Sequence, residues 1–217
     1  MSSSRSISPI PDGYSQLPAG KIASVVTYLE INDIADWPMP AQIGDYSIQP
    51  FDPTNLAAYR HLFRRVGAPW LWFSRLQLTD KELRTVLGRS DVETYALCQD
   101  GAAEGLLEID FGQLDEAELV YFGVTPEVIG GGAGKHLMQF ALHRVGTRHQ
   151  QHPLRRFWLH TCSLDHPRAL AFYQQIGFRA YARAIEVFDD PRLLGLLPRS
   201  AAPHVPLIES GFKVEPG

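Results

Sequence analysis

The chain has 217 residues, of which 45% are apolar and 20% charged, the composition of an ordinary globular protein, so a wholly disordered chain is excluded. No apolar run is long enough to span a membrane, and the first residues lack the apolar core of a secretion signal. We therefore expect a cytoplasmic protein with no membrane partner. The net charge is −4, which by itself points to no class of ligand.

Residues 1–20 are rich in Ser, Pro and Gly and have no hydrophobic period, so we expect a flexible lead-in outside the core. Residues 21–31 have the β-branched and aromatic content of a strand. The next helical period covers residues 52–66, with Pro53 near its start and Gly67 after its end.

A shorter helix is predicted over residues 80–87, with Thr79 or Asp80 as its cap. Two strands follow, at 92–99 and 103–111. They flank the dipeptide Asp100-Gly101, which accepts the positive φ angles of a tight turn and therefore indicates a hairpin.

A third strand is predicted over residues 117–124, and a glycine cluster at 130–134 separates it from a helix over 135–146. The remaining pattern indicates strand 157–161, helix 167–176 capped by Asp165 or His166 and stopped by Gly177, and strand 178–187. Without an internal repeat, this order predicts one α/β domain with a mixed sheet.

We therefore divide the chain into the lead-in 1–20, one domain over 21–188 and a C-terminal tail over 189–217. The tail places leucines and isoleucines among four prolines. We expect it to run over the domain as extended chain, with part of it under apolar cover.

Positive charge is concentrated in residues 128–164, which contain five Lys or Arg and no Asp or Glu. This favours one anionic ligand held at one place, with a solvated basic surface as the alternative. A nucleic-acid-binding protein would usually spread basic charge over a broad face, so we expect no nucleic-acid partner. Cys98 and Cys162 fit no metal-ligand spacing and are expected to be free thiols, so we expect no metal.

The glycine cluster leaves a strand and enters a helix, which is a geometry that binds phosphate. Glycines allow close approach of the backbone, and the first amides of a helix are unpaired at the positive end of its dipole. A nucleotide P-loop would need Gly at 129 and Ser or Thr at 136, where Ile129 and His136 stand. A dinucleotide fingerprint beginning at Gly130 would need Gly or Ala at position 135, which is Lys135.

The segment from Ile129 to Gly134 is similar to the pyrophosphate loop of the GNAT acetyltransferases, Q/R-x-x-G-x-G/A, at every position except the first. Residues 165–178, DHPRALAFYQQIGF, resemble the second GNAT signature, a helix with Ala and Tyr that ends at Gly-Phe. The likeness covers roughly residues 50–187. At Ile129 the Arg or Gln side chain is missing, so backbone amides and Lys135 must hold the pyrophosphate.

The resemblance implies the GNAT acyl-CoA N-acyltransferase fold, with a mixed, mostly antiparallel central sheet flanked by helices. It implies acetyl-CoA or another acyl-CoA as cofactor and an amine as acceptor. The residues expected to bind the cofactor are Phe122, Gly123, Val124, Ile129, Gly130, Gly131, Gly132, Ala133, Gly134, Lys135 and Ala169.

The catalytic residues implied by the resemblance are Glu118 and Tyr173. Glu118 occupies the position of the catalytic Glu in the histone-acetylating branch, and as a half-buried base it would take the proton of the attacking amine. Glu108 and Asp110 are the reserves, and a solvent-facing Glu118 is the alternative. Tyr173 is at the usual general-acid position and would protonate the leaving thiolate, unless it is a core aromatic.

For the acceptor we expect an aromatic wall from Trp70 and Trp72, with Tyr121 and His160 also facing the cleft; core packing is the alternative. The function expected is acetyl transfer from acetyl-CoA to a primary amine of a small molecule or peptide by direct attack. The alternatives are a catalytically silent acyl-CoA-binding regulatory module and, more remotely, nucleotide hydrolysis. A homodimer is one oligomeric state that the sequence allows.

Overall fold

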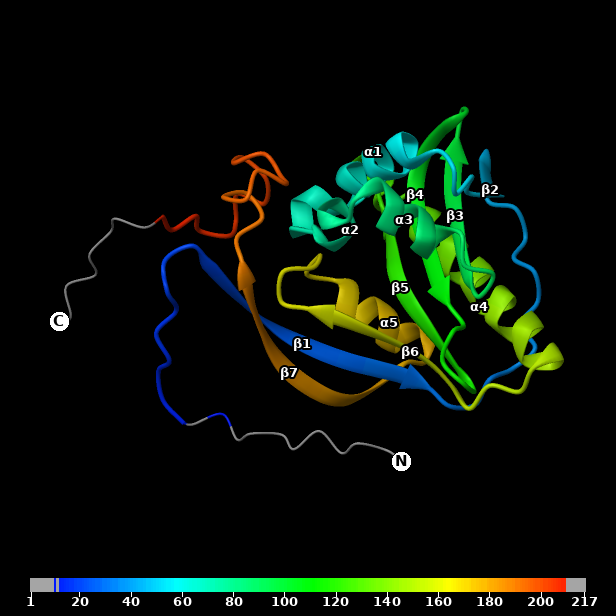
Figure 1. Cartoon of the computed structure of the whole chain (residues 1–217). Helices are drawn as coiled ribbons and strands as arrows, with labels where there is room; N and C mark the ends of the chain where they lie inside the picture. The colour runs from blue at the N-terminus through cyan, green and yellow to red at the C-terminus, as the bar shows by residue number, and fades with distance from the viewer. Residues whose placement is uncertain (1–9, 11, 210–217) are drawn as a thin grey trace.

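The computed structural model describes residue 10 and residues 12–209 of the chain (Figure 1). Its elements are β1 (Lys21–Ile31), β2 (Tyr46–Pro50), α1 (Leu56–Gly67), η1 (Ala68–Trp70), α2 (Ser74–Gln77), α3 (Asp80–Leu87), β3 (Val92–Gln99), β4 (Ala102–Asp110), β5 (Glu116–Val124), η2 (Pro126–Val128), α4 (Ala133–Gln151), β6 (Arg156–Cys162), α5 (Ala169–Ile176) and β7 (Arg179–Asp189). None of the described helices is both long and apolar enough to cross a membrane.

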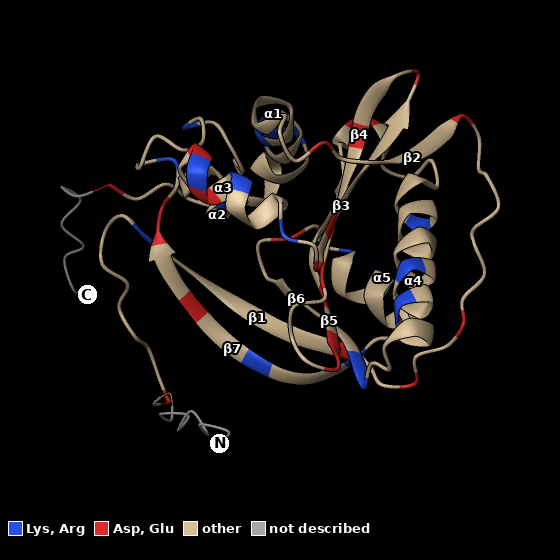
Figure 2. Ribbon diagram, turned by 45° about the vertical axis from the view of Figure 1, so that its right-hand side comes forward, with Lys and Arg blue, Asp and Glu red and all other residues tan. Residues whose placement is uncertain are grey.

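The seven strands form one sheet in the order β2-β3-β4-β5-β6-β1-β7. All neighbours are antiparallel except β5 and β6, which are parallel. This confirms the mixed, mostly antiparallel α/β fold. Two apolar clusters form the core, one under α4 and α5 and the other under α1 to α3, so helices cover both faces of the sheet (Figure 2).

Several locally encoded elements form as their sequences predict. The strand over residues 21–31 is β1, and α3 covers 80–87 with a capping box in which Thr79 and Glu82 satisfy each other's backbone N–H groups. At the turn between β3 and β4, Asp100 and Gly101 both have positive φ. The strand β2, the turn η1 and the short helix α2 were not predicted, because each is too short to carry a periodic signal.

The predicted start of α1 is wrong by four residues. The Asp52 side chain accepts hydrogen bonds from Thr54, at 2.8 Å from its N–H, and so closes a turn before the helix. The helix itself begins at Leu56, and Asn55 caps it by accepting from the N–H of Ala58. Pro53 therefore precedes the helix, and Gly67 is its last residue.

The predicted end of α4 at Gly146 is also wrong, because the helix continues to Gln151. A Cβ at Gly146 would lie 2.7 Å from the carbonyl oxygen of Ala35, so this glycine permits close packing inside the helix and does not stop it. The caps predicted for the following helix fail as well. It begins at Ala169, and the Asp165 carboxylate points back to Thr161 and the N–H of Cys162.

Of the N-terminal lead-in, residues 1–9 and 11 lie outside the described residues, and the others before β1 include no helix or strand. Residues 210–217 of the tail also lie outside them. Where we expected extended chain, residues 191–205 form successive turns. They are held around the buried Arg192, whose guanidinium donates to Asp190 and to four carbonyl oxygens, and Leu197 and Ala202 enter the core beside α1.

Candidate active site

Strands β5 and β6 separate after three paired residues. The register joins Glu116 to Arg156, Ala117 to Phe157 and Glu118 to Trp158, and β5 has no partner on that side beyond this point. On its other side, β5 stays paired to β4, and the N–H of Thr125 donates to the carbonyl of Glu104 at 2.8 Å. Because successive amides of a strand point to opposite sides, the N–H groups of Val124 and Phe122 point into the gap.

The glycine turn follows this free edge. Gly130 and Gly132 have φ values of 89° and 88°, which a side chain would strain. The first helical bond of α4 runs from the N–H of His136 to the carbonyl of Gly132, so the preceding N–H groups have no partner within the helix. A Cβ at Gly130 or Gly134 would meet no atom within 4 Å, which leaves the backbone open to a ligand.

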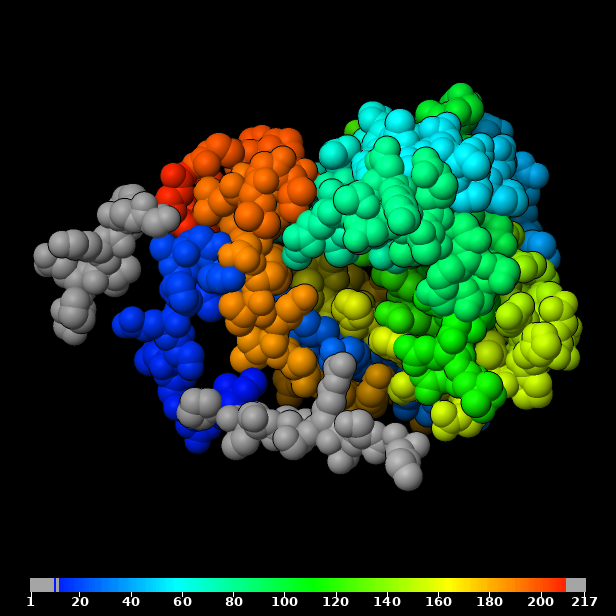
Figure 3. All heavy atoms as spheres, viewed as in Figure 1, coloured from blue at the N-terminus to red at the C-terminus, as the bar shows by residue number. Residues whose placement is uncertain are grey.

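A cleft of about 640 Å³ connects the gap between the strands to the glycine turn. Its walls include fourteen residues proposed from the sequence as binding the cofactor or the acceptor or as the general acid. They are Trp70, Trp72, Tyr121, Phe122, Gly123, Val124, Ile129, Gly130, Gly132, Gly134, Lys135, His160, Ala169 and Tyr173. Gly131 and Ala133 are not part of the lining, and Ala133 is fully buried. The surface is hollowed between α2, β5 and β7, with β6 in the floor of the hollow (Figure 3).

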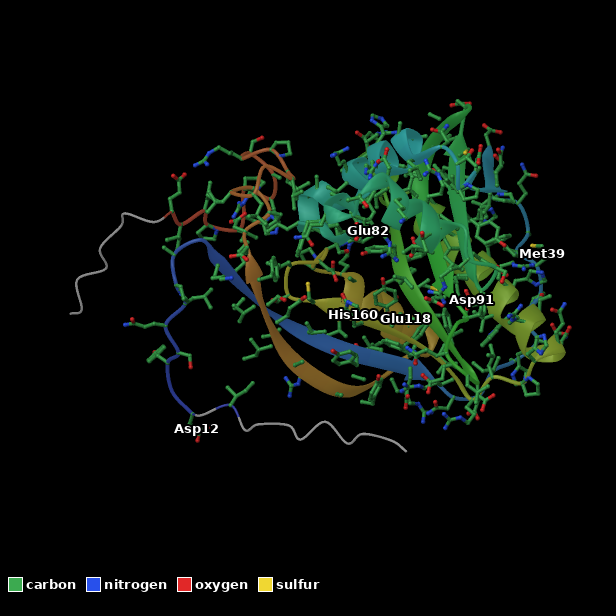
Figure 4. The ribbon with its side chains drawn as sticks, viewed as in Figure 1. Asp12, Met39, Glu82, Asp91, Glu118 and His160 are labelled. Carbon is green, nitrogen blue, oxygen red and sulfur yellow. The ribbon has the colours of Figure 1, made fainter. Side chains whose placement is uncertain are left out.

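Glu118 lies at the point where the strands divide, at the margin of the cleft and outside its lining. A β-bulge at Val120, between the pairs Ile109–Leu119 and Glu108–Tyr121, turns Glu118 and Tyr121 to the same face. Burial raises the pKa of Glu118 to about 7; the charges of Asp110 and Glu108 add to this, and Arg75 opposes it. Figure 4 labels Glu118 on β5 and His160 on β6, the two strands that separate here.

Tyr173 reaches the cleft from the other face of the sheet. Its side chain, on α5, is buried in the cluster under α4 and α5, with its ring 6.1 Å from that of Phe122. Burial raises the pKa of this phenol well above its usual value, and the nearby Asp165 charge raises it further. The hydroxyl therefore stays protonated at neutral pH and is a hydrogen-bond donor.

The segment between α1 and α2 crosses over the cleft and contacts the other half of the sheet. Three contacts join the two sides: the rings of Trp70 and His166 at 5.2 Å, the Trp72 indole N–H and Asp165 at 3.3 Å, and the stacked rings of Phe73 and Phe188 at 5.0 Å. A Cβ at Gly123 would lie 3.2 Å from Trp72 and 2.6 Å from Val66. This glycine therefore lets the indole lie on β5.

A buried ion pair that the sequence does not reveal holds α2 against the sheet. Glu108 is fully buried, bonds to the guanidinium of Arg75 and accepts from the Tyr59 hydroxyl at 2.8 Å. The guanidinium lies 5.0 Å from the centre of the Tyr121 ring. A charged residue inside the apolar run of β4 signals a buried partner, but nothing in the local sequence identifies Arg75.

Neither reserve carboxylate is free to act as a base in the cleft. Glu108 is bound to Arg75 and Tyr59, and Asp110 accepts from both terminal nitrogens of Arg89 at 2.9 and 3.0 Å. Glu118 takes part in no ion pair within the described part of the chain.

Residues 56–178 match the sequence model of the Acetyltransferase (GNAT) family. No curated protein is similar to the chain in sequence at a significant level.

Solved structures share the fold. A GCN5-related N-acetyltransferase from Sphaerobacter thermophilus has a TM-score of 0.58 at 14% identity, over 77% of this chain and 52% of its own. A conserved protein of unknown function from Staphylococcus epidermidis has a TM-score of 0.52 at 18% identity, over 79% and 63%. The ribosomal-protein-S18-alanine N-acetyltransferase from Escherichia coli has a TM-score of 0.52 at 19% identity, over 67% and 94%. The chain thus covers between half and two thirds of the length of the first two.

Proposed function

Since the chain belongs to the GNAT acetyltransferase family, a family of acyl-transfer enzymes, we propose that it moves an acetyl group from acetyl-CoA to a primary amine of a small molecule or peptide by direct attack. The observation that carries this proposal is Glu118, a carboxyl group with a raised pKa, at the point where two parallel strands separate above an open glycine turn.

The residues of the cleft fit the cofactor. The N–H groups at Gly132 to Lys135 have no partner in the helix, and the space over Gly130 and Gly134 is open, so a diphosphate would lie against the backbone. The free backbone groups of Phe122 and Val124 would bind an extended amide chain as a neighbouring strand does. Acetyl-CoA would supply the acetyl thioester and the leaving thiol.

Glu118 is proposed as the general base. An alkyl amine has a pKa near 10, so about one molecule in a thousand is neutral at pH 7. A carboxylate with a pKa of about 7 is half deprotonated there and is basic enough to accept the proton of the amine, directly or through water.

Tyr173 is proposed as the general acid. It enters the cleft from the face opposite Glu118. Glu118 would therefore take the proton of the acceptor amine from one side of the sheet, and Tyr173 would protonate the leaving thiolate from the other. Its raised pKa keeps the proton on the hydroxyl until a strong base such as a thiolate develops nearby. The N–H of Phe122, directed into the gap, would stabilise negative charge on the carbonyl oxygen.

We propose that residues 21–188 form the catalytic domain, that the tail packs on it, and that the protein works in the cytoplasm, where its two free thiols would stay reduced.

The test is thiol release from acetyl-CoA in the presence of a panel of amines and peptide N-termini, with mass detection of the acetylated product. Product with at least one amine, and its loss in Glu118→Gln, supports the proposal. The alternative is a silent acyl-CoA-binding module. One observation favours it: Ile129, which is 37% exposed, stands where the GNAT pattern has Arg or Gln. Tight binding of acetyl-CoA with no release above the buffer rate would favour that module.

A further inference from the structure

The cleft is lined by charged side chains of both signs. Lys135 lies in the first turn of α4, beside the glycine turn, and Arg168 directly precedes α5. The carboxylates of the lining are Asp165, in the turn between β6 and α5, and Glu186, on β7.

Of these two carboxylates, Asp165 already accepts hydrogen bonds from other residues of the protein. One oxygen accepts from Trp72 at 3.3 Å, and the other accepts from Thr161 at 2.7 Å and from the N–H of Cys162 at 2.9 Å. Glu186 makes no side-chain hydrogen bond or ion pair within residues 10 and 12–209. It is the carboxylate that is left to bind something from solution.

The surroundings of Glu186 suit a cation. It stands on β7 two residues before Phe188, whose ring stacks on Phe73 at 5.0 Å, and both rings line the cleft. Its neighbours on the same face of the strand, Ala184 and Phe188, are uncharged, and Arg183, three residues away, points to the other face. A carboxylate beside aromatic rings and without a cationic neighbour attracts an ammonium group.

Glu186 lies far from the proposed base. The register pairs Glu118 with Trp158 and Trp158 with Glu30 of β1, whereas Glu186 pairs with Ser24 of the same strand. Six residues of β1 separate the two positions, which is about 20 Å along the strand at roughly 3.3 Å per residue. One ligand can contact both carboxylates only if its two amine groups lie far apart.

We propose that Glu186 binds a second positive charge of the acceptor, so that the preferred acceptor is an amine with a distant cationic group. The inference rests on the proposed acetyl transfer and adds the class of acceptor. A long diamine and a peptide with a basic residue near its N-terminus share this chemistry.

The test compares octylamine with octamethylenediamine, which differ only in the second ammonium group, and with putrescine, whose two charges are close. The intact protein is expected to use octamethylenediamine with a KM about tenfold lower than that of octylamine. Glu186→Gln is expected to abolish this difference, and Glu186→Lys to reverse it. The KM for octylamine and the affinity for coenzyme A should not change. The KM is also measured for a peptide that carries Lys and for the same peptide with norleucine in place of Lys. A lower KM for the Lys peptide would identify a peptide side chain, as well as a diamine, as a source of the second charge.

Asp189→Asn is the matched control, because it removes a carboxylate from the other face of the same strand, where Asp189 pairs with Lys21 at 2.6 Å. It should leave the preference unchanged. Equal KM values for octylamine and octamethylenediamine in the intact protein, or an unchanged preference in Glu186→Gln, would overturn the inference while leaving acetyl transfer intact. If no amine is acetylated, the proposed function fails, and calorimetry of octamethylenediamine with the intact protein and Glu186→Gln then still measures whether Glu186 binds the cation.

Discussion

Trp72 donates its indole N–H to the Asp165 carboxylate at 3.3 Å and so joins the segment after α1 to the turn after β6, across the cleft. The two residues are 93 positions apart in the sequence. The same carboxylate fixes the end of β6 through Thr161 and Cys162, so the indole is anchored to a rigid acceptor.

Trp72→Phe keeps an aromatic ring but removes this hydrogen bond. We expect a loss of about 1 kcal/mol in the free energy of unfolding and a severalfold rise in the KM for the acceptor, because the wall over the cleft is no longer held. The affinity for coenzyme A should stay constant. Steady-state kinetics and urea denaturation check this, with Trp37→Phe, outside the cleft lining, as control. An unchanged acceptor KM would show that the contact does not shape the acceptor site.

The rate should depend on pH through Glu118. Because its pKa is raised to about 7, kcat/KM is expected to rise with pH up to about 7 and then to level off until the amine or Tyr173 titrates. Arg75 opposes the raised pKa, so Arg75→Gln should move the acid limb to higher pH. If the pH profile of kcat/KM for Glu118→Gln keeps the same acid limb, the limb reports the titration of another group.

Stability should follow the same ionisation with the opposite trend. A carboxyl group whose pKa of about 7 in the folded state exceeds its ordinary value of 4.5 binds more protons in the folded state between these two pH values. The free energy of unfolding contributed by Glu118 therefore falls as pH rises through that window. Glu118→Gln is expected to raise the thermal midpoint at pH 8 and to have little effect at pH 4.5. Thermal melts at the two pH values measure this, and an equal shift at both would contradict it.

Gly134→Leu tests the cofactor site without straining the backbone. A Cβ at this position meets no atom within 4 Å and φ is not positive, whereas Gly132 has a φ of 88° and would be strained by any side chain. We expect the thermal midpoint to be retained and the affinity for acetyl-CoA to fall by at least about tenfold, because the side chain fills the space in front of the helix amides. Binding by calorimetry at unchanged affinity would refute the assignment of the loop.

Tyr173→Phe should lower kcat by roughly a hundredfold while the affinity for acetyl-CoA changes little, since the ring still packs against Phe122 and only the donor is lost. Tyr95→Phe, which alters a half-buried hydroxyl outside the cleft lining, is the control. Normal turnover in Tyr173→Phe would show that Tyr173 is a core aromatic residue and not the general acid.

Glu108→Gln leaves the Arg75 guanidinium buried without its counter-charge. We expect a loss of about 3 kcal/mol in the free energy of unfolding, because the desolvated cation is no longer compensated. The double variant Arg75→Met, Glu108→Gln removes both charges and should recover part of this loss. Urea denaturation of the intact protein, Glu108→Gln, Arg75→Met and the double variant checks the prediction, and additive losses of the two single variants would show that the two charges do not depend on each other.

The sequence by itself determined the features that depend on neighbouring residues. The capping box at Thr79, the Asp100-Gly101 turn and the strand over 21–31 are encoded within a few positions, so composition and period were sufficient. The glycine turn could be predicted for the same reason, because glycine, which has no Cβ, permits the positive φ that Gly130 and Gly132 adopt. The fold followed from the order of such segments together with two family signatures.

Only the tertiary structure decided which side chains meet. The separation of β5 and β6 depends on pairings between strands about 40 positions apart, and it places Glu118 beside the cleft without an ion-pair partner among the described residues, whereas the reserves Glu108 and Asp110 are bound to Arg75 and Arg89. The partners Arg75 and Asp165 and the free carboxylate of Glu186 have no local signal, since neither a buried ion pair nor an unpaired charge leaves a periodic pattern. The helix predicted from the sequence ends at Gly146, whereas α4 continues to Gln151, and packing against Ala35 explains why a glycine stands at this position. Local chemistry therefore fixed the elements, whereas contacts between distant residues fixed the site.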